Sequence, residues 1–532
     1  MSFCFGVIIL TILFPLTAPY LPLTMVGQED YDRQRQILEV EIMNELCRAL
    51  GSVFPEDRVS WEESVLAGYG ADSSIPPGSS VYPSAVVLPK TTEEISHLLQ
   101  IADRFRVPVS PMARGSNIAG MAVPVQGGIV ADLRLMNRII EVNEDAAYAV
   151  IEPGVTFHDL SRTLKKAGFF CHLPTAAGGS SPLANYLMRP SGNFAARWDP
   201  DPVLALEVVT PGAGIIKTGS AAFETAGWRA RYHCFPDLTG LFANAYGTLG
   251  IVTKGAVKIF DRGEEERLIL TTFESFPPAV EYMKRIVRRN LAESVTFWTW
   301  GWNLFHEMMR SKAEKFPQEM LKPDQRTPPR GMAFGIASAR LSGYKKVVEA
   351  QQEVCIQIAR ELGGELMEDV EAREKHPGCY EYLKAYFVDG VHPKPGEESQ
   401  IRAGLHLPGC LVTAEPAKLM EIEKYMWEWA EREFKPPYFY RALPHSHARE
   451  FFFAFVVYVT GSLIEEREYL KHLKGIYGKL YRDLLRQYGG VMFRYRKDPT
   501  FFGMTGTYGA LLRRIKKLAD PNNIMNPGML LF

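Results

Sequence analysis

The segment from Ala113 to Gly120 reads Ala-Arg-Gly-Ser-Asn-Ile-Ala-Gly, a loop of small side chains with one cation. Small residues allow backbone amides to approach a ligand closely, and successive amides in a turn form a concave site for an anion. The loop is therefore a candidate phosphate site. It differs from the dinucleotide signature Gly-x-Gly-x-x-Gly, because the nearest match, Gly212-Ala-Gly214, has Lys217 where the third glycine belongs.

Short strands and helices surround this loop. An apolar run over 85–88 precedes Thr91-x-x-Glu94, a capping-box pattern that predicts a helix start, and 107–111 reads as the next strand. Further expected elements are a helix from Thr156 and strands over 128–132, 148–152, 204–210 and 215–217. This mixture of short elements predicts an α+β fold.

The pattern changes after residue 262, where longer elements follow. The expected elements are strands over 268–272 and 295–299 and helices over 278–291, 344–362 and 417–434. The last helix has an apolar stripe, which is more typical of a core than of a cofactor site.

Length and charge exclude several classes of protein. The chain has 532 residues with 60 basic and 61 acidic side chains, so it lacks the basic excess of nucleic-acid binders and the imbalance of disordered chains. With 46% hydrophobic residues it can build the cores of about two to four domains. Its 7 cysteines show no metal-ligand or disulfide-scaffold spacing, so no metal site is predicted.

The first 28 residues contain no charged side chain. A bilayer-spanning helix needs about 20 apolar residues, but Pro15, Pro19 and Pro22 interrupt this stretch and no basic residue precedes it. Three interpretations remain: a signal or anchor, a misassigned or buried start with translation beginning near Met25, or an amphitropic surface segment. We expect a cytoplasmic or periplasmic protein, with membrane association through residues 1–28 as an open alternative.

Five motifs follow one another in a fixed order. They are Tyr82-Pro-Ser-Ala-Val-Val-Leu-Pro89, Arg114–Gly120, Val150-Ile-Glu-Pro-Gly-Val155, Pro236-Asp-Leu-Thr-Gly-Leu-Phe242 and Thr248-Leu-Gly-Ile-Val-Thr253. With this ordered set the sequence resembles the vanillyl-alcohol oxidase and p-cresol methylhydroxylase (PCMH) family of FAD-dependent oxidoreductases. The resemblance is clearest over 84–262, and weaker matches continue to the motif at 520–528.

The resemblance implies an α+β fold with a two-part, PCMH-type FAD-binding domain and an inserted α+β substrate-binding cap. The implied divisions are an uncharged hydrophobic segment at 1–28, an N-terminal helix and lead-in at 29–80, the FAD-binding domain at 81–262, the cap at 263–485 and a C-terminal segment at 486–532 that returns to the FAD domain.

The resemblance also implies which residues contact FAD. Backbone N–H groups for the pyrophosphate would come from Arg114, Gly115, Ser116, Asn117 and Ile118. The ribityl chain and flavin edge would lie along Thr175, Gly178, Gly179, Ser181 and Asn185. The adenosine half would contact Gly250, Ile251 and Val252.

Members of this family often link FAD covalently through His or Tyr of a cap strand, or through His of the pyrophosphate loop. Here neither the strand at 449–455 nor the loop residues Ser116 and Asn117 supply such a group, so non-covalent FAD is expected. His445 and His447 lie just upstream and, at alternate positions, would share a strand face with Arg449. A flavin link, an active-site role and a structural or surface role all stay open for them.

Phenol-oxidising members hold their substrate as phenolate with a Tyr-Arg pair near the C-terminal segment and a second Tyr in the FAD domain. Tyr495-Arg496 matches the pair, and a cation beside a phenolic donor stabilises a developing oxyanion. Ile118 occupies the position of the second Tyr. The expected reaction is hydride transfer from the benzylic carbon of a para-substituted phenol to flavin N5, with Tyr495, Arg496, His445 and His447 as candidate catalytic residues.

Two other functions remain open. One is oxidation of a D-2-hydroxy acid or another alcohol, since Arg496 could pair with a carboxylate. The other is a catalytically silent flavoprotein subunit. The resemblance further implies a small aromatic substrate, a cytochrome or other electron acceptor, a homodimer and no nucleic-acid partner.

Overall fold

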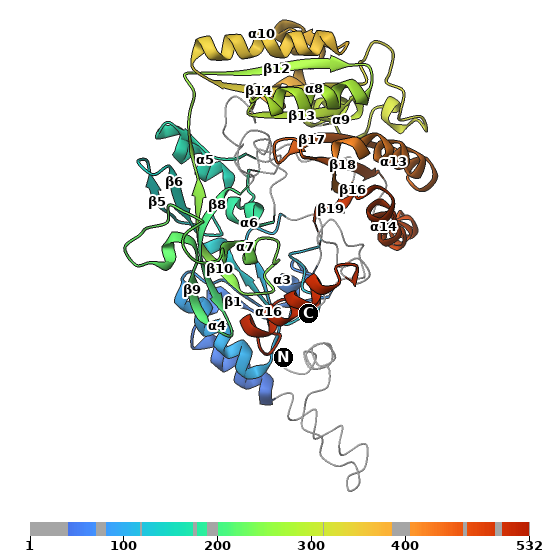
Figure 1. Cartoon of the computed structure of the whole chain (residues 1–532). Coiled ribbons are helices and arrows are strands. Elements are labelled where there is room, and N and C mark those ends of the chain that lie inside the picture. The colour runs from blue at the N-terminus through green and yellow to red at the C-terminus, as the bar shows by residue number, and fades with distance from the viewer. Residues whose placement is uncertain are drawn as a thin grey trace.

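The structure, a computed structural model, describes residues 41–70, 81–116, 120–173, 178–188, 201–311, 313–385, 405–460, 465–494 and 503–530. Two lobes lie one above the other in Figure 1. The first lobe comprises described residues up to 262 and after 502, and the second comprises those from 263 to 494. Sequence predictions at residues 1–28, Asn117, Ile118, Thr175, Tyr495 and Arg496 fall outside the described residues.

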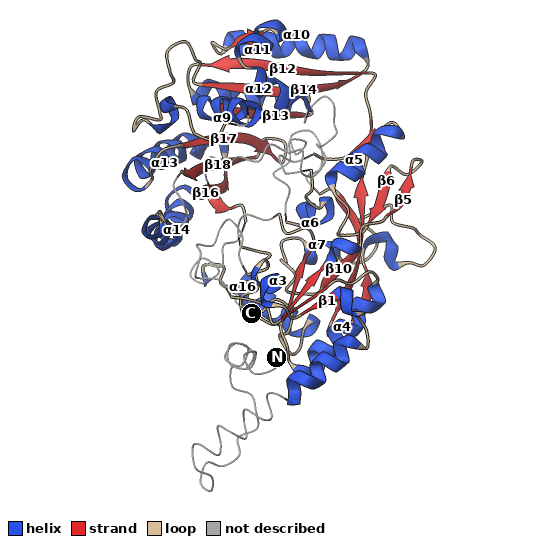
Figure 2. Cartoon of the chain, turned by 180° about the vertical axis from the view of Figure 1, so that it is seen from behind, coloured by secondary structure: helices blue, strands red, loops and turns tan. Residues whose placement is uncertain are grey.

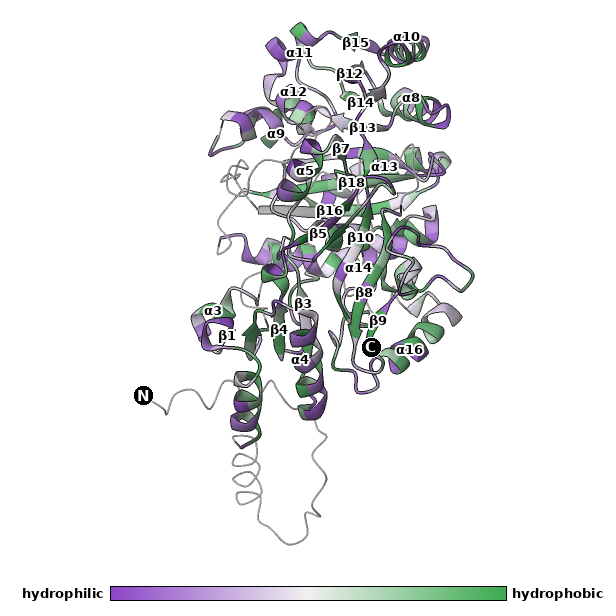
Figure 3. Cartoon of the chain, turned by 90° about the vertical axis from the view of Figure 1, so that its left-hand side faces the viewer, coloured by the Kyte–Doolittle hydropathy of each residue, from purple (hydrophilic) through white to green (hydrophobic). Residues whose placement is uncertain are grey.

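The first lobe begins with the predicted strand–helix–strand unit. Strands β2 (Ala85–Val87) and β3 (Val109–Met112) flank helix α4 (Thr92–Phe105), and both pair in parallel with β4 (Ile129–Asp132). Strand β1 (Val59–Ser60) completes the order β1-β2-β4-β3. The Glu94 backbone N–H donates a hydrogen bond to the Thr91 hydroxyl oxygen at 3.2 Å, which confirms the predicted helix cap. Helix α4 separates its apolar and charged residues onto different sides (Figure 3).

A second, antiparallel sheet completes this lobe. Its order is β5 (Ile139–Asn143), β6 (Tyr148–Ile151), β10 (Ile251–Lys258), β8 (Val203–Thr210) and β9 (Gly214–Lys217). Strands β8 and β9 form the predicted hairpin around Gly212. The other elements are α3 (Glu63–Ala67), α5 (Phe157–Lys166), β7 (Phe169–Phe170), α6 (Pro182–Leu187), α7 (Thr239–Phe242) and β11 (Phe260–Asp261).

One eight-stranded antiparallel sheet forms the second lobe (Figure 2). Its order is β15 (Glu365–Met367), β12 (Glu265–Phe273), β14 (Gly335–Gly343), β13 (Ser294–Thr299), β17 (Tyr438–His445), β18 (Glu450–Val459), β16 (Leu405–Ala414) and β19 (Val491–Met492). The helices are α8 (Phe276–Arg288), α9 (Trp300–Ser311), α10 (Lys345–Glu361), α11 (Asp369–Lys375), α12 (Pro377–Lys384), α13 (Leu419–Glu433) and α14 (Arg467–Tyr488).

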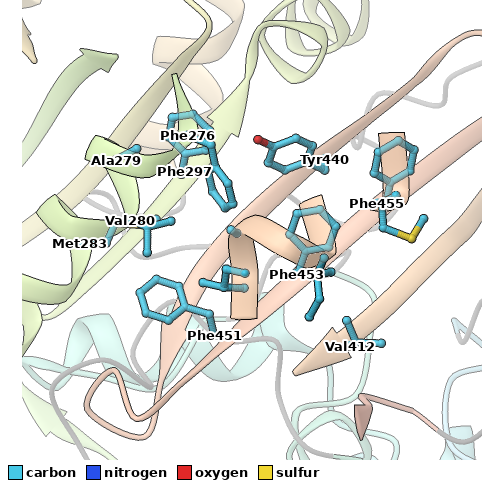
Figure 4. Close-up of a cluster of buried hydrophobic side chains, with 14 of the residues drawn as sticks. Phe276, Ala279, Val280, Met283, Phe297, Val412, Tyr440, Phe451, Phe453 and Phe455 are labelled. Carbon is cyan, nitrogen blue, oxygen red and sulfur yellow. The ribbon is translucent and has the colours of Figure 1, made fainter. Parts of the chain in front are cut away.

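The two faces of this sheet have different partners. Tyr440, Phe453 and Phe455 belong to the aromatic core that packs against α8, α10, α13 and α14, part of which is drawn in Figure 4. Alternate side chains in a strand point to opposite faces. Arg441, Phe452 and their alternating neighbours therefore face away from this core, toward α9 and the first lobe.

The chain returns to the first lobe through α16 (Thr507–Ala519). Lys516 is buried there, and its ammonium donates hydrogen bonds to the Thr248 carbonyl oxygen at 2.7 Å, the Asp520 carboxylate at 2.6 Å and the Met525 carbonyl oxygen at 2.8 Å. The Val109 N–H donates to the Ile524 carbonyl oxygen at 2.7 Å, so the C-terminal residues extend the edge at β3. Within the described ranges, no helix combines the length and the apolar character needed to cross a bilayer.

Candidate active site

A cavity of about 450 Å³ lies between the two lobes. This volume is within the usual range for a small-molecule site. The first lobe contributes the loop after β3, helix α6 and the segment before β10, while the second lobe contributes the sheet face opposite the aromatic core. The cavity therefore joins the predicted cofactor loops to the cap.

The loop after β3 forms the first part of the wall. Arg114, Gly115 and Ser116 line the cavity, and the Arg114 Nε donates a hydrogen bond to the Gly179 carbonyl oxygen at 3.3 Å. Gly115 has a φ of +67°, a left-handed conformation that favours glycine and turns the loop sharply. Two segments 65 residues apart in the chain thus meet at the site.

Helix α6 forms the second part of the wall. Its first turn is capped by Ser181, whose hydroxyl oxygen accepts a hydrogen bond from the Ala184 N–H at 3.2 Å, so this hydroxyl stabilises the helix as well as lining the cavity. Asn185 is 8% exposed, and its Oδ1 is buried with no hydrogen-bond partner among the described residues. Buried polar atoms are usually hydrogen-bonded, so this acceptor is compatible with a donor from a ligand hydroxyl or N–H.

The segment before and at the start of β10 forms the third part. Gly250 and Val252 line the cavity, whereas the Ile251 side chain is buried in the core of the first sheet. A Cβ atom on Gly247 would lie 2.3 Å from Pro111 Cγ, so this position requires glycine for two loops to meet. Gly178 is absent from the described lining residues.

These features fit FAD. Amides of small residues beside Arg114 suit the pyrophosphate, and the unpaired Asn185 acceptor suits the hydroxyls or N–H groups of the ribityl–flavin half. Of the residues that the resemblance assigns to FAD, the following line the cavity: Arg114, Gly115, Ser116, Ser181, Asn185, Gly250 and Val252. Gly179 contacts Arg114, and the FAD contacts themselves stay a prediction.

The cap wall contains a cation among aromatic rings. Arg441 of β17 is 9% exposed, and its guanidinium carbon lies 5.3 Å from the Trp298 ring centroid, 5.7 Å from that of Trp302 and 5.9 Å from that of Phe452. These distances are within cation–π range. Arg441, Trp302 and Phe452 line the cavity, whereas Trp298 is absent from the described lining residues.

His306 supports this wall from behind. Its ring stacks on that of Tyr382, a cavity residue, with centroids 4.2 Å apart and planes at 21°. Burial, together with the charge of Arg441, lowers the pKa of His306 to about 3. His306 therefore stays neutral near neutral pH and acts as a packing surface for the Tyr382 ring.

A second cation, Arg494, lines the cavity just after strand β19. The ring of Phe493 packs against that of Phe452 with centroids 4.4 Å apart and planes at 49°, and the next residue, Arg494, lines the cavity as Phe493 does. Arg494 Nε is buried without a hydrogen-bond partner among the described residues. Burial lowers the pKa of Arg494, and nearby Tyr246 opposes this shift. An arginine remains charged at neutral pH in any case.

The predicted strand face shared by His445, His447 and Arg449 is wrong, whereas the role of the two histidines stays a prediction. His445 ends strand β17, buried at 1% exposure and packed near Phe452 and Phe493, and it is absent from the described lining residues. Ser446, His447 and Ala448 all have positive φ values, so the chain turns there and His447 does not continue the strand face toward Arg449. The alternate-residue pattern of a strand does not extend past His445, because the hairpin turn begins at Ser446.

The sequence reasoning missed the residues that line the cavity from the second lobe, among them Trp302, Tyr382, Arg441, Phe452, Phe493 and Arg494. Arg441 left a usable signal, because it is the one charged residue in the otherwise apolar run Tyr-Phe-Tyr-Arg-Ala-Leu-Pro at 438–444. Trp302 and Tyr382 left none, since aromatic residues on helices are ordinarily core residues.

Comparisons with known proteins identify an FAD-binding domain in the first lobe. Residues 83–219 match the FAD binding domain family. The chain is 33% identical to glycolate oxidase subunit GlcD of Bacillus subtilis over 209 residues, which are 38% of the chain and 43% of that relative. It is 24% identical to the 4-cresol dehydrogenase [hydroxylating] flavoprotein subunit of Pseudomonas putida over 370 residues, covering 65% and 68% of the two chains. It is 22% identical to a D-lactate dehydrogenase of Anaerostipes hadrus, covering 85% and 90%.

The chain spans only about half the length, between 43% and 53%, of several curated relatives that it matches, the glycolate oxidase subunit among them. Two solved structures match nearly the whole chain. p-Cresol methylhydroxylase superposes with a TM-score of 0.77 at 20% identity, and 4-ethylphenol oxidase from Gulosibacter chungangensis with 0.78 at 18% identity, each covering 92% of this chain and 97% of the other. The predicted α+β fold and FAD cofactor are confirmed: residues 83–219 match an FAD-binding domain, and the chain has the fold of the PCMH-type FAD-dependent oxidoreductases.

Proposed function

We propose that the chain is a dehydrogenase or oxidase that transfers hydride from the benzylic carbon of a para-substituted phenol to flavin N5. The observation that supports this most is the cap wall, where Arg441 and Arg494 share a cavity with the rings of Trp302, Tyr382 and Phe452 opposite the FAD-binding loops. Aromatic rings accept the face of a flat substrate, and cations favour the ionised form of its hydroxyl.

The protein's contribution is to stabilise negative charge on the phenol oxygen. A free phenol resembles the tyrosine side chain, with a pKa of about 10, and a nearby cation lowers this value. The phenolate form promotes departure of hydride from the benzylic carbon, and FAD, when bound, supplies the acceptor. The aromatic wall keeps water from the cations, which strengthens their effect. Tyr495 and Arg496 remain proposed donors from the C-terminal segment.

A D-2-hydroxy acid is the second candidate. Its support is the similarity to a glycolate oxidase subunit and a D-lactate dehydrogenase, together with the ability of an arginine to pair bidentately with a carboxylate. The aromatic rings of Trp302, Tyr382 and Phe452 on the cap side of the cavity suit a ring better than a three-carbon acid, so the phenol is placed first.

Anaerobic reduction of the flavin separates these candidates. The full chain is purified with FAD, and the visible flavin band is followed after addition of 4-ethylphenol or D-lactate without oxygen. Bleaching by 4-ethylphenol alone supports the proposal, and bleaching by D-lactate alone assigns the second candidate. Absence of bleaching by both would contradict both functions.

We also propose that FAD is held without a covalent bond, because His445 packs outside the described cavity lining. Acid precipitation should then release the yellow colour into the supernatant. Colour retained in the protein pellet would contradict this.

A further inference from the structure

Helix α16 carries apolar side chains on its solvent-exposed side. Tyr508 is 64% exposed, Leu511 56% and Leu518 78%. Their spacing places them on one face of the helix, as an apolar stripe. Gly509 and Lys516 lie on the side that is buried against the protein. The apolar stripe (Tyr508, Leu511 and Leu518) is therefore separate from the contact that holds the helix in place.

The orientation of α16 is fixed by that contact. The Lys516 ammonium donates hydrogen bonds to the carbonyl oxygens of Thr248 and Met525. Beside it, Leu512 packs against the core of the second lobe and Ile515 against a core of the first lobe. A rotation that buried the apolar stripe would break these contacts. The stripe therefore stays on the surface of the first lobe, where Figure 1 shows the helix.

Basic side chains accompany the apolar stripe. The sequence of α16, Thr-Tyr-Gly-Ala-Leu-Leu-Arg-Arg-Ile-Lys-Lys-Leu-Ala, contains no acidic residue. Arg514 and Lys517 are exposed, and neither forms an ion pair with another residue in the described ranges. Arg514 is at helical spacing from both Leu511 and Leu518, so it shares their side of the helix. The surface of the helix therefore combines apolar side chains with positive charge.

A second exposed apolar cluster shows the contrast. The rings of Phe223 and Phe235 stack with centroids 6.2 Å apart in the segment before α7, and both are exposed. Arg231 of this segment pairs with the carboxylates of Asp201 at 3.0 Å and Asp237 at 2.9 Å. The charge of Arg231 is therefore balanced within the protein, unlike the charges of Arg514 and Lys517.

An anionic bilayer complements both properties of α16. Amphipathic helices with Lys and Arg beside an apolar stripe lie in the interface of membranes, and anionic lipids attract each cation. Residues 1–28 contain no charged side chain, and α16 of a second copy is itself basic, so neither supplies the negative charge that Arg514 and Lys517 require.

We propose that α16 is a docking surface for a bilayer that contains anionic lipids. Leu511 and Leu518 enter the outer part of the acyl layer, and Tyr508 lies at the level of the head groups. Arg514 and Lys517 pair with the phosphates and carboxylates of those head groups. The short stripe gives a reversible attachment, and this attachment does not depend on which substrate reduces the flavin.

Sedimentation with sucrose-loaded vesicles tests the proposal on the FAD-loaded full chain. One set of vesicles contains phosphatidylcholine alone, and the other contains phosphatidylcholine mixed with phosphatidylserine. The wild-type protein should bind the mixed vesicles about tenfold or more tightly than the neutral ones, because each cation contributes about fivefold near an anionic surface. Added salt should weaken this binding, since salt screens exposed charges.

Two double variants remove the two parts of the surface separately. Arg514→Gln with Lys517→Gln should weaken binding to the mixed vesicles by about tenfold or more, because both cations are lost. Leu511→Gln with Leu518→Gln should weaken it by about tenfold or more as well, because the apolar area that enters the acyl layer is lost.

The matched control is Lys346→Gln with Val347→Gln at the start of α10. Val347 is 49% exposed beside the exposed Lys346, but this helix also carries acidic residues. The control variant should bind the mixed vesicles as wild type does. All substituted positions are exposed, so FAD content and circular dichroism should match those of wild type; if one α16 variant fails to fold, the other decides the question.

Three results would overturn the proposal. The first is absence of binding to the mixed vesicles. The second is equal binding to both kinds of vesicle that the α16 variants leave unchanged, which would assign the contact to another segment such as residues 1–28. The third is a change of oligomeric mass in the α16 variants, measured by light scattering without lipid, which would assign the apolar stripe to a second copy of the chain.

Discussion

The buried imidazole of His306 should make the second lobe sensitive to mild acid. Its ring is 1% exposed, and neither ring nitrogen has a hydrogen-bond partner among the described residues. Burial and the charge of Arg441 lower its pKa to about 3, whereas the unfolded chain has the ordinary value of about 6.5. Below about pH 6.5 the unfolded chain therefore binds a proton that the folded protein rejects, and stability falls as the pH is lowered.

The size of this effect follows from the pKa difference. Each pH unit below about 6.5 costs about 1.4 kcal/mol until the folded-state pKa is reached, so acidification from pH 7 to pH 5 removes about 2 kcal/mol. His306→Phe removes the titrating group and keeps a ring against Tyr382. We expect the free energy of unfolding of this variant to fall by about 2 kcal/mol less than that of wild type over this range. Urea unfolding followed by tryptophan fluorescence at both pH values measures the difference.

His97 of α4 is exposed and provides the control. His97→Gln should retain the wild-type response to acid. If wild type and His306→Phe lose equal stability between pH 7 and pH 5, the imidazole is hydrated or paired in solution, and the reasoning from its burial is refuted.

Three other substitutions test separate parts of the molecule. Lys516→Met leaves the buried Asp520 carboxylate without its cation, so the free energy of unfolding measured in urea titrations should fall by about 3–5 kcal/mol. The control is Lys517→Met, at an exposed position, which should change the free energy of unfolding by less than about 0.5 kcal/mol. Burial raises the pKa of Glu207, but hydrogen bonds from Lys254 and Thr92 outweigh this effect and hold the pKa below its ordinary value. The resulting stabilisation of the folded protein is present above about pH 4.5 and is lost as the pH falls further. The free energy of unfolding of Glu207→Gln should therefore depend less on pH below that point than that of wild type. Asn185→Ala should weaken FAD binding by about tenfold, measured by the fluorescence of released FAD, because the buried Oδ1 is lost; equal affinity would remove Asn185 from the cofactor site.

Much of the first lobe could be predicted because its signals are local. The Thr91–Glu94 cap, the hairpin at Gly212 and the small residues of the loop at Arg114 are each contained in a few consecutive residues. Local chemistry of this kind specifies the start of a helix or the path of a turn without knowledge of the rest of the fold. The ordered set of such segments then identified the FAD-binding domain.

The cap side of the site could not be predicted in the same way. Trp302, Tyr382 and Arg441 come from α9, α12 and β17, and they meet because α9 packs against both α12 and β17 in the folded second lobe. The error at His447 has the same origin, since a turn of three left-handed residues interrupts the alternation that the sequence pattern assumed. Long-range pairing and backbone conformation decide these positions, and neither is visible in a short sequence window.

Alternate residues of strands β17 and β18 face two different environments, the helix-covered core and the cavity. One set, including Tyr440, Phe453 and Phe455, builds the core against the helices, and the alternate set, including Arg441 and Phe452, faces the cavity. Substitutions in the second set alter the shape and charge of the ligand site while the packing that folds the lobe stays intact. The same scaffold can therefore acquire new substrates through changes at alternate positions of two strands, which makes this pair of strands the natural target for directed evolution of the enzyme's specificity.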